Sequence, residues 1–541
     1  MDGSLSTAIA VVVGSALLLR LSYSCLLPKP VPSIPHNPVT SLLGDIPAIS
    51  QAVKDGNGLF SDFVARTVRV HGPVCQILLG WHRMVIVNDR TETERLVGGG
   101  KITDTSKRLR SIFATALPNS QISLPANETW KKHRRLSGPS MSKRYLGRMS
   151  SRTGSGANRL VELWKAKYAL VGCAAFDAEL DFQLATMHRV NVTLGCSIGC
   201  IKSARDALPL NFLLSTGVAH LPHSDPPPLY KAGKVMIKEI ERALQSPFPV
   251  LTTWLFTYTS PTWRKYYRFM RSFFTTAITQ ARERELDQIG EGLSTDADCV
   301  LDMILQRERR EGEESFGKDN ILDELITYVF AGQDTTAVSL SWLFKYLATD
   351  ADIQHRLHDE VCAVFGPDTE SDEPLDFNLL DDPDRVPILE SIVAETMRHA
   401  GVSAIMARDL LQDEIILGRL VPKGTQLMFT TALMSKDESE WGPDAREWRP
   451  SRWLTSDGAF NRSAGPSIPF GVGQRSCFGQ RLAILQLKTY LATMSRAFFF
   501  KPVPPEVDTW EAVELVTRRP MLCYVSLERW NSDSRSRYEV A

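Results

Sequence analysis

Residues 470–479 read Phe-Gly-Val-Gly-Gln-Arg-Ser-Cys-Phe-Gly, and an apolar segment typical of a helix follows from Gln480 to about Phe499. This stretch places one cysteine, Cys477, in a glycine-rich turn just before a helix start. Glycine at positions 471, 473 and 479 allows positive φ and a close approach of the backbone to a flat ligand. Backbone N–H groups at the helix start, together with the charge of Arg475, favour a thiolate over a thiol. We therefore expect Cys477 to be a soft, anionic metal ligand.

The spacing Phe-x-x-Gly-x-Arg-x-Cys-x-Gly resembles the haem-binding motif of the cytochrome P450 family, and every specified position is met. The resemblance implies haem b (iron protoporphyrin IX) as the cofactor and Cys477 as the axial ligand of its iron. A thiolate in this place favours cleavage of the O–O bond. Phe470, Arg475 and Gly479 are then cofactor-binding residues.

Composition limits the alternatives. The chain has 541 residues with 62 basic and 62 acidic side chains, so a zero net charge argues against a nucleic-acid partner. Its nine cysteines are odd in number and widely spread, which does not indicate a disulfide framework. No internal repeat or low-complexity linker divides residues 48–541, which we expect to form one haem-thiolate catalytic domain.

The amino end is mostly apolar from Leu5 to Leu27, long enough for a hydrocarbon core of about 30 Å. A cleaved signal peptide is the alternative, but no positive charge precedes the segment and no clear small-x-small cleavage site precedes Pro28. We expect residues 1–27 to be a single transmembrane anchor and the proline-rich residues 28–47 to be a hinge. Lysines follow the segment, which predicts a cytosolic catalytic domain. The resemblance implies the endoplasmic reticulum membrane.

Trp130 and Arg134 lie four residues apart, so on a helix they share one face. An indole N–H and a guanidinium can both donate to a carboxylate. The pair resembles the family's Trp-x-x-x-Arg, which binds a haem propionate, although a tryptophan over an arginine stem is often plain packing.

A long apolar helix is predicted from Asp319 to about Ala348, and it contains Ala-Gly-Gln-Asp-Thr-Thr at residues 331–336. Glycine, aspartate and threonine are poor residues for a helix interior, and such a local conflict marks a functional site. A threonine hydroxyl there can bond back to the helix carbonyls. The stretch resembles the family's Ala-Gly-x-Asp-Thr-Thr, which implies that Ala331 and Gly332 contact the cofactor and that Asp334 and Thr335 relay protons. A kinked core helix is the alternative.

Glu395 and Arg398 lie three residues apart on one helical face, and Arg452 follows downstream. The resemblance implies that these three form a buried, structural charge network that fixes the cysteine loop. It also implies that Arg408 binds a propionate, although Gly401 stands near the place where the family often has proline.

Short β-prone runs predict further elements. Val74–Leu79 and Met84–Val87 predict a hairpin, and Thr425–Phe429 predicts a strand after a turn. We also expect a hairpin from Leu515–Thr517 and Met521–Leu527 around residues 518–520. The apolar residues of 246–261 indicate either a membrane-interface patch or a buried connector.

The fold predicted from this resemblance is mainly α with a smaller β-rich region, the cytochrome P450 fold, preceded by the transmembrane helix. The resemblance is to microsomal eukaryotic members, in particular those of filamentous-fungal secondary metabolism. It implies a monooxygenase that hydroxylates or epoxidises a lipophilic small molecule, such as a terpenoid, polyketide or alkaloid intermediate, using O₂. Roughly forty residues follow Phe499, too few for a flavin domain, so electrons are expected from a separate NADPH-dependent flavin reductase. A haem-thiolate isomerase or dehydratase, and a peroxygenase that needs no reductase, are the alternatives.

Overall fold

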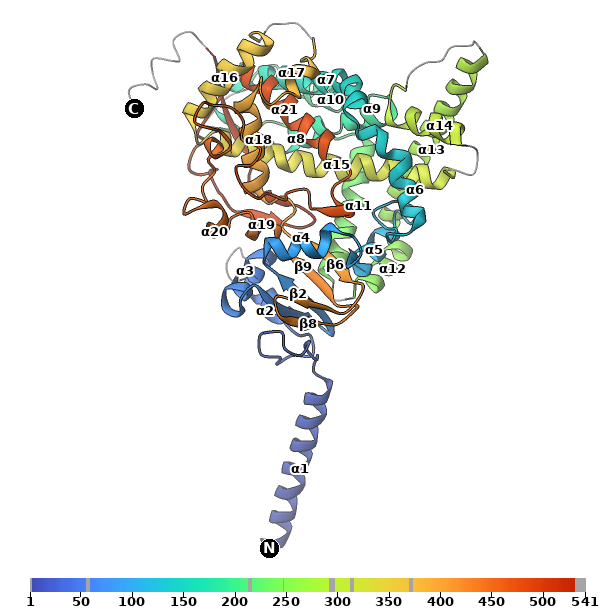
Figure 1. Cartoon of the computed structure of the whole chain (residues 1–541), viewed down its shortest axis with the longest axis vertical. Coiled ribbons are helices and arrows are strands. Elements are labelled where there is room, and N and C mark those ends of the chain that lie inside the picture. Colours follow the sequence, from blue (N-terminus) through green and yellow to red (C-terminus); the bar gives the residue numbers. More distant parts are fainter. Residues whose placement is uncertain are drawn as a thin grey trace. The chain divides into compact units, whose positions relative to one another are not determined.

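The computed structural model describes residues 2–54, 59–212, 217–246, 248–290, 297–311, 316–368 and 373–530. The chain forms two units, one of residues 1–106 with 405–430 and one of residues 107–404 with 431–541. Helices dominate the second unit and strands are concentrated in the first (Figure 1). The predicted class, mainly helical with a smaller β-rich region, is confirmed.

The first unit is built around a five-stranded sheet in the order β1-β2-β9-β6-β3. Its elements are α1 (Asp2–Leu26), α2 (Ile46–Lys54), α3 (Phe60–His71), β1 (Val74–Leu79), β2 (His82–Val87), α4 (Arg90–Gly98), β3 (Thr103–Thr105), β6 (Met406–Leu410), β7 (Glu414–Ile416), β8 (Arg419–Val421) and β9 (Gln426–Phe429). The predicted hairpin is confirmed, because β1 and β2 pair antiparallel across a turn in which Gly80 has a φ of 61°. The predicted strand at 425–429 is β9, which pairs parallel with β2.

Apolar side chains of this sheet form a core with α3. Cys75, Ile77 and Ile86 are fully buried there against Phe63 and Val64. Among the described residues, no helix combines the length and the apolar character that crossing a membrane requires.

The second unit surrounds one long helix, α15 (Lys318–Leu347), as predicted. Its other elements are α5 (Lys107–Ala114), α6 (Glu128–Ser137), η1 (Gly138–Met141), α7 (Lys143–Val171), β4 (Ala175–Asp177), α8 (Glu179–Thr186), α9 (Arg189–Leu194), α10 (Cys200–Asp206), β5 (Val218–Ala219), α11 (Pro228–Gln245), α12 (Pro249–Thr259), α13 (Pro261–Gly290), α14 (Val300–Glu311), α16 (Ala351–Phe365), α17 (Phe377–Leu380), α18 (Pro387–Ala400), α19 (Thr431–Met434), α20 (Glu438–Trp441), η2 (Pro450–Trp453), η3 (Gly473–Arg475), α21 (Gln480–Ala497), β10 (Phe498–Lys501), β11 (Ala512–Glu514), β12 (Arg518–Pro520) and β13 (Tyr524–Arg529).

Helices α8, α9, α18 and α21 all pack against α15, which runs through the middle of this unit (Figure 1). Aromatic rings fill the space between them: Trp164 of α7 contacts Phe182 and Phe344 in edge-on geometry. Burial of three such rings, at about 25 cal/mol per Å² of apolar surface, makes this cluster a major contribution to the stability of the unit.

The predicted carboxy-terminal hairpin is wrong in register. Residues 518–520, expected to be the turn, form strand β12, which pairs with β11 so that Ala512 faces Pro520. The turn consists instead of residues 515–517, where the N–H of Leu515 donates to the carbonyl of Thr517. Pro520 is tolerated because it ends the edge strand of a two-stranded ribbon, where no further hydrogen bond is required of it. Strand β13 pairs with β10 and β4 in another sheet.

The apolar stretch of residues 246–261 largely forms α12. Its side chains are not those of a buried connector, because Val250, Leu251 and Trp254 are more than half exposed. Phe248, Leu255 and Tyr258 are exposed beside them. The prediction of a buried connector is therefore wrong, and the stretch presents an apolar surface.

Candidate active site

The cysteine loop connects η3 to α21 in the second unit. Gly471 and Gly473 have φ of 68° and 73°, a conformation that other residues rarely adopt. The N–H of Cys477 donates to the carbonyl of Phe470 at 2.9 Å, which closes the loop. Gly479 differs from the prediction, because its φ of −88° needs no glycine; it is the N-cap of α21.

Cys477 is exposed to solvent, yet surrounding protein atoms desolvate its thiol. Burial raises its pKa, and three groups act against this increase: the N–H of Gly479 and the guanidinium groups of Arg189 and Arg134. The sequence predicted Arg475 as the neighbouring cation. Arg475 instead points toward the segment before α6, where it donates to the carbonyls of Gln121 and Leu124. The cations that act on the sulfur come from elements far away in the sequence.

Helix α6 supplies Trp130 and Arg134 on one face, as the four-residue spacing predicts. Arg134 lies over the Trp130 ring with its guanidinium carbon 5.2 Å from the ring centre, and Arg475 approaches the same ring to 4.2 Å. Nη2 of Arg134 donates to the carbonyls of Gln474 and Ser476 at 3.0 and 2.7 Å. The structure thus brings Trp130, Arg134, Arg475 and the cysteine loop together.

One face of α15 differs from the rest of that helix. From Ile321 to Leu347 every residue is buried except Ala331, Gly332 and Thr335. The Thr335 hydroxyl donates to the carbonyl of Ala331 at 2.8 Å, the predicted back-bond within the helix. These three positions lie on one side of the helix and carry small side chains.

Asp334 points away from this accessible face and is 7% exposed. Its carboxylate accepts a hydrogen bond from Thr517 at 2.9 Å and lies 3.7 Å from Nζ of Lys234 in α11. Asp334 and Thr335 are therefore adjacent in sequence but directed to different surroundings. Lys234 and Thr517 were missed by sequence reasoning, because no local pattern relates them to residue 334.

The accessible face of α15 lies close to the cysteine loop. Tyr328, one turn before Ala331, stacks on Phe478 with ring centres 5.2 Å apart. Arg189 touches both sides: a Cβ at Gly332 would come within 1.8 Å of its guanidinium, and one at Gly479 would lie 3.9 Å from it. The α15 side presents small, accessible residues, and the cysteine-loop side presents an accessible thiol with cations nearby. This arrangement fits a flat cofactor that carries a metal and acidic groups.

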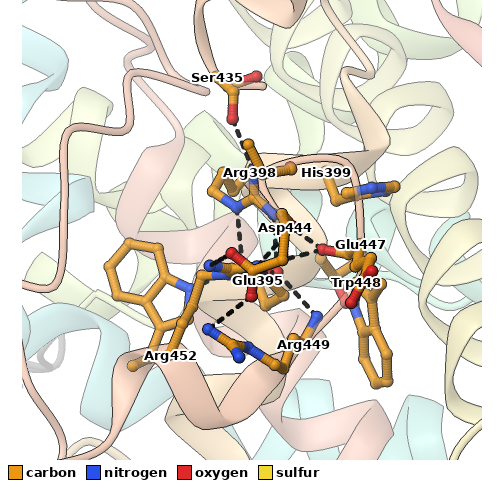
Figure 2. A network of polar contacts seen from close by, with 12 residues as sticks. Glu395, Arg398, His399, Ser435, Asp444, Glu447, Trp448, Arg449 and Arg452 are labelled. Atoms are coloured by element: carbon orange, nitrogen blue, oxygen red, sulfur yellow. Dashed lines mark hydrogen bonds and ion pairs between the residues drawn. The ribbon is translucent and has the colours of Figure 1, made fainter. Parts of the chain in front are cut away.

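The Glu395 network fixes the chain ahead of the cysteine loop (Figure 2). Arg398 donates through Nε and Nη2 to both oxygens of Glu395 at 2.8 Å, and Nε of Arg452 donates at 2.9 Å. The indole of Trp453 and the N–H of Arg449 complete the carboxylate's partners at 2.9 Å each. Arg398 donates further to backbone carbonyls of three residues: Ser435, Ala445 and Glu447. The structure brings together all three residues that the sequence grouped.

Burial alone would raise the pKa of Glu395, but the bonds from Arg398, Arg449 and Trp453 outweigh it and lower that pKa. His399 lies beside the network and contacts the carbonyl of Arg446 at 2.6 Å and the hydroxyl of Tyr346 at 3.0 Å. Burial, followed by the charge of Lys436, lowers the pKa of His399 to about 4. The histidine is therefore neutral at pH 7.

Arg408 belongs to the first unit. It lies in β6 between Thr105 of β3 and Leu427 of β9. Its side chain is buried, and Nη1 donates to the carbonyl of Ala407 at 2.9 Å. Its assignment to a propionate stays a prediction.

Comparisons with known proteins identify the family of this chain. A family model described as Cytochrome P450 matches residues 35–524. Similar chains include the Cytochrome P450 monooxygenase GME11363 of Pestalotiopsis microspora, which is 28% identical over 97% of this chain and 99% of the other. Cytochrome P450 monooxygenase TRI13 of Fusarium sporotrichioides is 26% identical over 95% and 98% of the two chains.

A solved structure shares the fold. The crystal structure of the cytochrome P450 CYP102L1 superimposes with a TM-score of 0.72 over 93% of this chain and all of that chain, at 18% identity. Together with the match of the family model over most of the sequence, this shows that the chain belongs to the cytochrome P450 family of monooxygenases, which are oxidoreductases.

Proposed function

We propose that this chain hydroxylates or epoxidises a lipophilic small molecule, a secondary-metabolite intermediate of the terpenoid, polyketide or alkaloid class. Electrons come from a separate NADPH-dependent flavin reductase. The observation that carries the proposal is the accessible, small-residue face of α15 lying against the loop of Cys477. Family membership implies haem and O₂ for this reaction.

Cys477 would hold haem through its sulfur, and haem bound there would supply the activation of O₂. Trp130 and Arg134 would donate to an acidic group of the cofactor; in support, Arg134 lies beside the cysteine loop, where it donates to two loop carbonyls. Phe470, Arg475 and Gly479 shape the loop. Ala331 leaves room for the cofactor on the α15 side, and Gly332 lets the helix backbone lie against both the cofactor and the guanidinium of Arg189. Glu395, Arg398 and Arg452 hold the preceding segment in place.

Thr335 and Asp334 are proposed to relay protons to the reaction site. The Thr335 hydroxyl donates its proton to the carbonyl of Ala331, so its oxygen is left to accept a hydrogen bond from a water or an oxygen species on the accessible face. Asp334 is buried, and the partly exposed Lys234 lies 3.7 Å from it on the side of α11. Lys234 thereby gives the carboxylate a polar route to solvent.

Membrane attachment is a further part of the proposal. The chain would be held at the endoplasmic reticulum by residues 1–27, with residues 28–47 as hinge, residues 48–541 as catalytic domain and the catalytic domain in the cytosol. The exposed apolar side chains of α12 support contact with a lipid surface in the second unit. Expression of the chain with and without residues 1–27, followed by sedimentation of membranes, tests this part.

The main test is a comparison of metabolites from a host with and without the chain, supplied with ¹⁸O₂. A new product carrying one ¹⁸O atom, formed only with NADPH and a reductase, is expected. Product formed with hydrogen peroxide and no reductase would instead identify a peroxygenase. Product formed without consumption of O₂ would identify an isomerase or dehydratase.

A further inference from the structure

Arg189 is a buried cation without a matching anion among its protein neighbours. Arg189 is 4% exposed. It is the first residue of α9, and two residues separate it from the end of α8. Its Nη2 donates to Oε1 of Gln486 in α21 at 2.5 Å and lies 3.4 Å from the hydroxyl of Thr336 in α15. Both partners are neutral. Within the described part of the chain, no Asp or Glu forms an ion pair with Arg189, and its Nε has no hydrogen-bond partner.

Burying an isolated guanidinium is costly, so a charge of opposite sign is expected nearby. The Cys477 sulfur is an anion when it serves as a metal ligand, and Arg189 lies beside its loop, with Nη1 3.9 Å from the position that a Cβ of Gly479 would occupy. Burial lowers the pKa of Arg189 to about 10, and the Cys477 and Tyr490 side chains act against the decrease, so the guanidinium stays charged at neutral pH. Tyr490 is neutral at that pH, because burial raises its pKa well above 10.

The backbone around Arg189 is suited to this placement. Gly332 has no side chain, and any Cβ there would collide with the guanidinium. Gly479, two residues after the cysteine, lies next to the same guanidinium, since a Cβ there would be 3.9 Å from its Nη1, an ordinary contact distance. Arg189 therefore reaches both helices between which the cofactor is expected to lie.

We propose that Arg189 is the counter-charge of the Cys477 thiolate, a positioning residue whose fixed positive charge raises the reduction potential of the bound haem. The inference rests on the proposed role of Cys477. A positive charge beside the ligand stabilises the ferrous state, which carries one more electron than the ferric state. Because the charge acts in a water-poor interior, its effect is larger than that of a surface arginine.

The experiment is a redox titration of the haem-loaded full chain, followed by its absorption, for five proteins. Arg189→Gln removes the charge, and Gln486→Glu leaves every atom of Arg189 in place but gives it a carboxylate partner. Arg189→Lys keeps the charge, and Thr336→Val removes the weak hydroxyl contact only. At a fixed potential the ferrous-to-ferric ratio should fall about tenfold in the first two variants, or about 59 mV for one electron. It should change less than about twofold in Arg189→Lys and Thr336→Val.

Wild-type potentials in both Arg189→Gln and Gln486→Glu would overturn the inference and leave the proposed function intact. If Arg189→Gln fails to retain haem, Gln486→Glu alone decides. Loss of haem from both, with retention in Arg189→Lys and Thr336→Val, supports the inference, because charge rather than packing then holds the cofactor. A wild-type protein without the absorption of a thiolate-ligated haem would contradict the proposed function itself.

Discussion

The Glu395 network and the surroundings of Cys477 lie in the same unit but compensate their charges in opposite ways. Around Glu395, each carboxylate oxygen has two or more donors, and Arg398 is bonded on every side. Around Cys477, Arg189 has only neutral hydrogen-bond partners, and three small residues of α15 stay accessible. A fully compensated buried cluster destabilises the fold when one member is removed, whereas an incompletely compensated one indicates where a ligand binds. The predictions below test this difference.

The largest effect is expected at the cysteine. Cys477→Ser removes the soft, anionic ligand, so the reduced protein under carbon monoxide should lose entirely the red-shifted absorption of a thiolate-ligated haem. Cys173→Ser, at an exposed cysteine, is the matched control and should keep it. Far-ultraviolet circular dichroism should show both variants folded. Retention of the absorption in Cys477→Ser would remove the basis of the cysteine assignment.

A substitution in the Glu395 network is expected to lower the stability of the folded chain. Glu395→Gln leaves two buried arginines with an uncompensated charge, so the free energy of unfolding should fall by about 3–5 kcal/mol. Chemical denaturation measures this. Glu438→Gln is the control, because its ion pair with Arg446, at 3.3 Å, is exposed on both sides. In the control the free energy of unfolding should fall by less than about 1 kcal/mol. An equal decrease in the two variants would contradict the structural role of the Glu395 network.

His399, at the edge of the network, predicts a pH dependence. Its pKa is about 4 in the folded chain and about 6.5 when unfolded. Between these values the unfolded state binds more protons, so stability falls as pH drops from 6.5 to 4. The stability advantage of wild type over His399→Gln should shrink by up to about 3 kcal/mol across that window. A difference that stays constant in denaturation curves at pH 7, 6, 5 and 4 would contradict the neutral, buried histidine.

The smallest effect concerns proton handling on the accessible face. Thr335→Ala should bind haem normally but convert a larger share of consumed NADPH into hydrogen peroxide, by about threefold or more. Ser341→Ala is the matched control, since its hydroxyl makes the same back-bond, to Ala337, at a buried position of α15. The measurement is the ratio of peroxide to NADPH with a reductase and a substrate. Unchanged coupling in Thr335→Ala would assign the hydroxyl to helix structure alone.

Local patterns predicted the elements that carry the site. The period of apolar residues predicted α15 to within one residue at each end, and the four-residue spacing predicted that Trp130 and Arg134 share a face. The three-residue spacing paired Glu395 with Arg398, the family resemblance supplied Arg452, and the structure joins all three. The end of α21 was predicted two residues late, since Phe498 and Phe499 continue the apolar pattern but belong to β10.

Long-range contacts outside the family motifs could not be predicted. Arg189, Lys234 and Thr517 reach the site from α9, α11 and the β11–β12 turn, and nothing in their own neighbourhoods distinguishes them from ordinary surface residues. The register of that ribbon was also wrong, because Pro520 was expected in a turn. A proline at a strand end satisfies the same local preference, and only the pairing with Ala512 distinguishes the two.

The parallel pairing of β2 with β9 has a consequence for how the chain matures. Thr430 bonds to Asn88 across 342 residues of sequence, so the sheet of the first unit cannot close until the second segment leaves the ribosome. At a translation rate of about 5–20 residues per second, one edge of strand β2 stays unpaired for roughly 20–70 s. During that interval the nascent hairpin, with apolar Val85, Ile86 and Val87, exposes a strand edge that other chains can pair with.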